Sequence, residues 1–186
     1  MGMAAATRWT VERVRALPDD RNRYEVIDGE LYVSPAPKWP HQAATRELFL
    51  ILRAYLDGCS AGDVWFAPAD IVFDNENMVE PDLFVVPRVE DRRARSWEDV
   101  RRLLLAVEIL SPSTARADRQ AKRRLYQRQG VPEYWIVDLD ARVIERWRRE
   151  DERPEILTER LDWQPDPAHP ALTIELESYF TEVLGE

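Results

Sequence analysis

A run of apolar residues interrupted by one carboxylate limits the folds open to this chain more than any other feature of its sequence. The segment LLLAVEIL, residues 103–110, has the nearly continuous apolar character of a strand that is buried on both faces. An ionised carboxylate inside such a strand, here Glu108, costs several kcal/mol unless something compensates it. The segment therefore predicts a covered strand and a partner for Glu108, either an arginine in a buried salt bridge or a metal ion.

The rest of the chain predicts strands alternating with helices. Asp28-Gly29 lies between two alternating runs in RYEVIDGELYV and predicts a tight hairpin, because both turn positions require positive φ. An amphipathic helix is expected from His41 to Gly58, where the glycine would end it. Further helices are expected at 9–17, where Thr10 is the cap, at 111–129 and near 177. Strands are expected at 64–73 and 79–86, which would pair across the turn DNEN, and at 133–139 and 142–149, which would pair as a second hairpin. One more strand is expected near 155–160.

Length and composition favour one soluble domain over residues 1–186. The chain is 45 % hydrophobic and 33 % charged, and it has no run of about eighteen apolar residues that could cross a bilayer. Its start does not resemble a secretory signal, and the single cysteine, Cys59, fits a reducing compartment, so we expect a cytoplasmic protein and no membrane partner. Since no Cys/His cluster has zinc spacing, any metal ion must use oxygen ligands.

The net charge of −9 is unevenly distributed. Residues 150–186 contain eleven Asp or Glu against two Arg, whereas residues 1–149 contain 24 of each sign. Within the balanced part, residues 113–128 carry six basic side chains against Asp118 alone. This basic helix is either an ordinary solvated face or a surface that contacts phosphates, with Arg116, Arg119 and Arg123 as the candidate nucleic-acid-binding residues.

Two carboxylates and one lysine could form a metal-dependent hydrolytic site. Asp82 precedes the apolar run LFVV and is either a turn residue or a carboxylate at the mouth of a buried strand. If its strand neighbours that of Glu108, the pair suits Mg²⁺, which could activate water against a phosphodiester. Lys122, spaced four residues from Asp118 and from Tyr126, is either the cation of this site or half of a surface ion pair.

Several segments, taken in order, resemble the Uma2 (DUF820) family of endonucleases, in the PD-(D/E)XK superfamily: YEVIDGEL, His41-Gln42, VEPDLFVV, AVEILSPST and AKRRLYQRQGVPEYWIVD. The resemblance covers about residues 9–149 and leaves the acidic segment 150–186 outside. It implies an α/β, restriction-endonuclease-like fold with a central mixed β-sheet flanked by helices and an N-terminal β-hairpin. It also implies cleavage of DNA with Mg²⁺, or Mn²⁺ in its place, by a homodimer or higher homo-oligomer.

The resemblance also assigns roles to residues of this sequence. Asp82 matches the metal-binding aspartate of the PD element, Glu108 matches the acidic member of (D/E)XK, and the carbonyl of Ile109 is implied as a third metal ligand. The lysine position of the motif is Leu110 here. The Uma2 pattern shares this departure, and a lysine from the following helix, matching Lys122, takes over the role.

Two further residues match active-site positions of the family. Glu25 is implied as an additional acidic ligand, although it could be the polar face of the hairpin. His41 is implied as a phosphate contact or proton-transfer group, although it could cap or pack a helix start.

Other function classes find less support in the sequence. There is no Walker loop, dinucleotide glycine fingerprint, G-x-S-x-G elbow or partnered cysteine nucleophile. The alternatives left open are a nuclease-like module that binds nucleic acid or protein without catalysis, and hydrolysis of a different phosphate ester.

Overall fold

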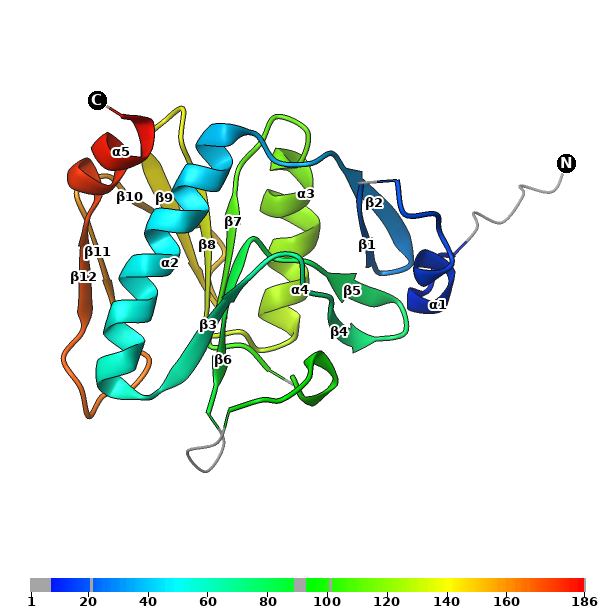
Figure 1. The fold of residues 1–186 in the computed structure, drawn as a ribbon, viewed down its shortest axis with the longest axis horizontal. Helices are drawn as coiled ribbons and strands as arrows, with labels where there is room; N and C mark the ends of the chain where they lie inside the picture. Colours follow the sequence, from blue (N-terminus) through cyan, green and yellow to red (C-terminus); the bar gives the residue numbers. More distant parts are fainter. Residues whose placement is uncertain (1–7, 21, 89–92, 101, 186) are drawn as a thin grey trace, which may run out of the picture.

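A six-stranded mixed sheet forms the centre of the molecule. The computed structural model describes residues 8–20, 22–88, 93–100 and 102–185. The strand order is β10-β9-β8-β7-β6-β3, with β7 and β8 parallel and every other pair antiparallel (Figure 1). The strands are β3 (Gly62–Phe66), β6 (Leu83–Pro87), β7 (Leu105–Ile109), β8 (Glu133–Asp138), β9 (Val143–Arg148) and β10 (Glu155–Leu157). The fold class predicted from the sequence is therefore confirmed.

A smaller antiparallel sheet lies beside the central one. Its order is β2-β1-β5-β4, and its strands are β1 (Arg23–Ile27), β2 (Glu30–Ser34), β4 (Ile71–Asp74) and β5 (Asn77–Val79). The hairpin between β1 and β2 is confirmed, with Asp28 at φ 52° and Gly29 at φ 78°. Helix α1 (Val11–Arg15) precedes it and is capped by Thr10, as predicted.

The prediction of two continuous strands at 64–73 and 79–86 is wrong in one respect. The segments do pair with each other, but each is divided between the two sheets: β3 pairs with β6, and β4 pairs with β5. Pro68 and Pro81 lie at the two breaks, where a residue without an N–H cannot continue the ladder of a central strand. As a result Asp82 lies where the chain enters the central sheet from the smaller one.

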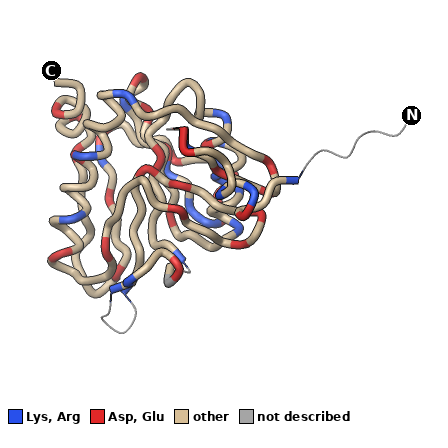
Figure 2. Tube along the Cα trace, turned by 45° about the vertical axis from the view of Figure 1, so that its right-hand side comes forward, with Lys and Arg blue, Asp and Glu red and all other residues tan. Residues whose placement is uncertain are grey.

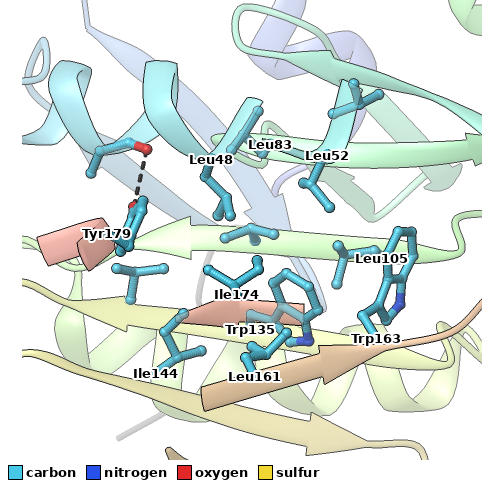
Figure 3. Packing of buried hydrophobic residues seen from close by; sticks show 14 of the residues in the cluster. Leu48, Leu52, Leu83, Leu105, Trp135, Ile144, Leu161, Trp163, Ile174 and Tyr179 are labelled. Atoms are coloured by element: carbon cyan, nitrogen blue, oxygen red, sulfur yellow. Dashed lines mark hydrogen bonds between the residues drawn. The ribbon is translucent and has the colours of Figure 1, made fainter. Parts of the chain in front are cut away.

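One face of the central sheet is covered by helix α2 (Trp39–Cys59) and by the C-terminal elements β11 (Arg160–Trp163), β12 (Leu172–Glu175) and α5 (Leu176–Leu184). Figure 3 shows Leu48 and Leu52 of α2, Trp135 of β8, and Trp163 and Ile174 of the C-terminal strands within one apolar cluster. The hydroxyl of Tyr179 donates to the carbonyl of Ala44 at 3.0 Å (Figure 3). The acidic C-terminal segment therefore supplies part of the core.

Helix α2 does not end at Gly58 as predicted. It continues to Cys59, and Ser60 adopts the left-handed cap conformation at φ 55°. The N–H of Ser60 donates to the carbonyl of Leu56 at 2.9 Å, which satisfies a carbonyl at the helix end without a glycine.

The opposite face of the sheet is covered by a helix of mixed geometry. It comprises α3 (Ala115–Ala117), a π-helical turn (Asp118–Lys122) and α4 (Arg123–Arg128), so it begins four residues later than the predicted helix 111–129. A short 3₁₀ turn (Trp97–Asp99) lies in the connection before β7. Single π turns inside helices are frequent at functional sites, because the extra residue redirects the side chains around it. Among the described residues no helix has the length and apolarity to cross a membrane.

Two glycine substitutions provide a matched test of the packing. A Cβ at Gly62 would lie 2.6 Å from the carbonyl oxygen of Val86, whereas nothing lies within 4 Å of one at Gly58. We expect Gly62→Ala to lower the free energy of unfolding by about 1–3 kcal/mol and Gly58→Ala to raise it by up to about 1 kcal/mol. Urea denaturation measures both, and a Gly62→Ala protein as stable as the parent would contradict the close approach of β3 to β6.

Candidate active site

Asp82 and Glu108 lie side by side on neighbouring strands. β6 and β7 are antiparallel with Leu83 opposite Val107, so the residue before Leu83 lies beside the residue after Val107. The backbone N–H of Ile109 donates to Oδ2 of Asp82 at 2.8 Å. Both carboxylates are buried at the junction of the two sheets.

Asp82 is held by two basic side chains. Nε2 of His41 lies 3.0 Å from Oδ2, and Nη1 of Arg23 lies 2.9 Å from Oδ1. Burial alone would raise the pKa of Asp82, but His41, Arg23 and Lys122 outweigh burial and lower the pKa to about 2. Asp82 is therefore ionised at neutral pH. His41 reaches it from the first turn of α2, so the simple capping interpretation of His41 is incomplete.

Glu108 has a lysine as its partner rather than the arginine that the sequence left open. Nζ of Lys122 lies 2.8 Å from Oε1 of Glu108, and the hydroxyl of Tyr126 lies 3.3 Å from the same oxygen. Burial raises the pKa of Glu108 well above its ordinary value, although Lys122 opposes the shift. Both of these contacts are made to Oε1 of Glu108 and not to its other oxygen, Oε2.

Lys122 lies at the centre of three carboxylates. Its Nζ is 2.8 Å from Glu108, 2.9 Å from Oε1 of Glu25 and 3.6 Å from Oδ1 of Asp118. Its side chain is 2 % exposed, so the interpretation as a surface Asp–Lys pair is wrong. Burial would lower the pKa of Lys122, but the three carboxylates outweigh it and raise the pKa well above the ordinary value, which keeps the amine charged.

Glu25 is an internal member of this cluster and not part of a solvated hairpin face. It is 2 % exposed, and its Oε1 also accepts the N–H of Glu80 at 2.8 Å. Strand β1 places Glu25 and Arg23 two residues apart, hence on one face, and directs both towards the site. Arg23 was not among the residues predicted from the sequence; its spacing from Glu25 on an alternating strand is the signal that could have found it.

The donor atoms suit a hard cation. Asp82 and Glu108 offer carboxylate oxygens without sulfur or a histidine cluster, and Mg²⁺ commonly uses one or two carboxylates while keeping several waters. Within the described residues no group of three or more His, Cys, Asp or Glu side chains could hold a metal ion. An ion here would therefore depend on two carboxylates and on water or backbone oxygens for its other ligands.

The three arginines predicted to contact nucleic acid do not share one environment. Arg116 is exposed. Arg119 donates to Glu145 at 2.7 Å and to Asp138 at 3.0 Å, and Arg123 lies over the ring of Trp147 at 4.8 Å. Acidic and basic residues are interspersed along the visible trace in Figure 2, and two acidic residues, Asp138 and Glu145, engage Arg119 of the basic helix.

Asp118 gives the site a measurable pH dependence. It is 1 % exposed, neither of its oxygens has a hydrogen-bond partner among the described residues, and burial, partly opposed by Lys122, raises its pKa to about 6. A carboxyl whose pKa is raised on folding contributes stability that is full below the unfolded pKa and is lost as pH rises through the folded one.

Between pH 4 and pH 7 the free energy of unfolding of the parent is expected to fall as Asp118 loses its proton. In Asp118→Asn this fall is expected to be smaller, by up to about 3 kcal/mol. Urea denaturation at the two pH values measures the difference. Parallel pH profiles for the two proteins would contradict the assigned environment of Asp118.

Comparison with known proteins identifies the family of this chain. The sequence model of Uma2, described as "Putative restriction endonuclease", matches residues 11–177. The chain belongs to the Uma2 family. A protein of Synechocystis sp. named only as uncharacterized is 27 % identical over 136 residues, which is 71 % of this chain and 69 % of the relative.

A solved structure shares the fold of this Uma2 protein. The crystal structure described as a putative nuclease belonging to DUF820 from Anabaena variabilis superposes with a TM-score of 0.73 at 18 % identity. The match covers 94 % of this chain and 98 % of the other. The arrangement of the two sheets and their helices is thus that of a DUF820 protein.

Proposed function

We propose that this Uma2-family protein is a divalent-metal-dependent endonuclease that hydrolyses phosphodiester bonds of DNA. The observation that carries the proposal is the buried cluster at the sheet junction, in which Lys122 reaches Glu108 at 2.8 Å while Asp82 lies on the adjacent strand. Burying a lysine among carboxylates is costly and adds little to stability compared with apolar packing. Such a cluster is typical of sites where chemistry is carried out.

In this proposal Asp82, Glu108 and the carbonyl of Ile109 hold one Mg²⁺, or Mn²⁺ in its place. The bound ion would supply a Lewis acid for a phosphate oxygen and a water of lowered pKa. The remaining roles belong to the chain itself. Lys122, charged at neutral pH, stabilises negative charge that develops on the phosphate or orients the attacking water, and Glu25 fixes its position.

His41 and the basic helix complete the proposed site. His41, 3.0 Å from Asp82, protonates the leaving oxygen or contacts a phosphate. Arg116, which is exposed, is the best placed of the three helix arginines to bind DNA backbone, whereas Arg119 and Arg123 would first have to leave their partners. Such contacts position DNA without reading its sequence. We also propose a homodimer, which sedimentation at several protein concentrations tests.

One observation favours the second candidate, a nuclease-like module that binds without cutting. Lys122 and Tyr126 both engage Oε1 of Glu108, and His41 and Arg23 engage Asp82, so a metal ion must compete with existing contacts at both carboxylates. Turnover distinguishes the two candidates, since a binding module shows none.

The test is nicking of supercoiled plasmid in Mg²⁺ or Mn²⁺, followed on single-stranded and branched DNA. Asp82→Ala and Glu108→Ala are expected to abolish nicking, as is EDTA, whereas Asp57→Ala, at an exposed carboxylate of α2, is expected to retain it. Nicking that persists unchanged in both site variants would exclude this site as its origin. A folded protein that binds DNA but never nicks it would support the binding module.

A further inference from the structure

Arg23 has donors that the protein does not use. Its Nε lies 2.7 Å from Oε1 of Glu80, and its Nη1 donates to the Glu80 carbonyl at 3.1 Å and to Asp82 at 2.9 Å. Its Nη2 donates no hydrogen bond to the described part of the chain. The side chain is 16 % exposed, so this nitrogen reaches the solvent at the edge of an otherwise buried site.

The surroundings of Arg23 fix its orientation. A guanidinium is planar and always charged, so the two hydrogen bonds from Nη1 and the ion pair between Nε and Glu80 leave little freedom for the third nitrogen. The two N–H groups on Nη2 are therefore held in fixed directions beside Asp82. Because a guanidinium keeps its charge at any ordinary pH, these donors suit an anionic oxygen such as that of a phosphate.

Asp82 has partners other than Arg23 that stabilise its negative charge. Oδ2 of Asp82 already accepts from the Ile109 N–H at 2.8 Å and lies 3.0 Å from His41. By contrast, the amine of Lys122 is already shared among three carboxylates. Among these site cations, Arg23 combines an assured charge with an unused donor.

We propose that Arg23 contacts the DNA backbone at this site, with Nη2 donating to a non-bridging oxygen of the phosphate that is cut or of one next to it. The inference rests on the proposed function, because it takes DNA as the substrate. Glu80 and Asp82 hold the guanidinium in place.

The test measures DNA binding rather than cleavage. Affinity for a short fluorescent duplex is measured by anisotropy in EDTA at several salt concentrations, for the parent, Arg23→Gln, Arg23→Met and Arg23→Lys. The logarithm of affinity falls linearly with the logarithm of salt concentration, and loss of one phosphate contact makes this slope shallower by about 0.9. We expect both neutral variants to show this loss, with roughly tenfold weaker binding at low salt, and Arg23→Lys to keep the parental slope.

A matched control and a second readout exclude a purely structural role. Arg53→Met removes an exposed arginine of α2 outside the site and is expected to keep the parental slope. Calorimetric titration with Mn²⁺ is expected to show affinity in Arg23→Gln equal to or tighter than in the parent, because a positive charge beside Asp82 is gone. Folded neutral variants with the parental slope, or with weakened Mn²⁺ binding alone, would overturn the proposal and make Arg23 a support for Asp82.

The result separates this inference from the proposed function. If the parent nicks plasmid and the neutral variants keep its slope, the inference fails and the nuclease stands. If the slope becomes shallower in the neutral variants but no protein nicks DNA, the phosphate contact is supported and the proposed nuclease activity is refuted. No DNA binding by the parent refutes both.

Discussion

Glu108→Gln is expected to lower the rate of Mg²⁺-dependent DNA cleavage about 1000-fold, which corresponds to about 4 kcal/mol of lost transition-state stabilisation. Glutamine has the shape of glutamate, so the contacts of Lys122 and Tyr126 to Oε1 can persist while the charge that attracts a divalent ion is lost. Because burial already penalises the ionised form of Glu108, its neutral replacement should leave the fold intact. Single-turnover cleavage and thermal denaturation measure the two quantities.

The matched control is Glu133→Gln, a partly buried carboxylate at the start of β8 that accepts from the Trp135 indole at 2.8 Å. It changes the same chemical group on another strand of the sheet. We expect parental cleavage from it. Equal losses in the Glu108 and Glu133 variants would show that the effect comes from the fold and not from the site.

Lys122→Met is expected to lower the free energy of unfolding by about 3–5 kcal/mol at pH 7. The substitution leaves Glu25, Glu108 and Asp118 close together without a compensating cation. Glu108 and Asp118 can then avoid repulsion only by binding protons, so the pKa values of these two carboxyls rise. A carboxyl with a raised pKa contributes stability that is lost as pH increases. The difference in free energy of unfolding between Lys122→Met and the parent should therefore be smaller at pH 4.5 than at pH 7.

Urea denaturation at the two pH values measures this gap, and Lys38→Met is the control. These are the two lysines of the chain, beside 24 arginines, and Lys38 is exposed before α2. We expect the Lys38 variant to lie within about 0.5 kcal/mol of the parent. A Lys122→Met protein as stable as the parent at both pH values would contradict the buried ion cluster.

The parts of the fold that follow from short-range physics could be predicted from the sequence. Asp28-Gly29 determines its hairpin because two neighbouring residues take positive φ. The apolar run around Glu108 predicted a buried strand because β7 is covered on both faces. The carboxylate pair could be predicted for the same reason: a charge in such a strand needs a partner, and the spacing of Asp118, Lys122 and Tyr126 placed candidates on one helix face.

The remaining features depend on contacts between distant parts of the chain. Arg23 meets Asp82 across 59 residues of sequence, and only the junction of the two sheets brings them together. The division of 64–73 between two sheets has a local signal in Pro68, but the sheet that each half joins is set by tertiary packing. Charge counts along the sequence predict a basic helix, whereas Glu145 and Asp138, which engage Arg119, come from other strands.

In the proposed site Asp82 and Glu108 share one divalent cation. The most direct measurement is the anomalous scattering of Mn²⁺ in a crystal of the parent protein soaked with the ion. We predict a single peak in contact with both carboxylates, with Lys122 still beside Glu108. An absence of any peak there at saturating Mn²⁺, with the His41–Asp82 and Lys122–Glu108 pairs unchanged, would contradict a shared metal ion at these two carboxylates.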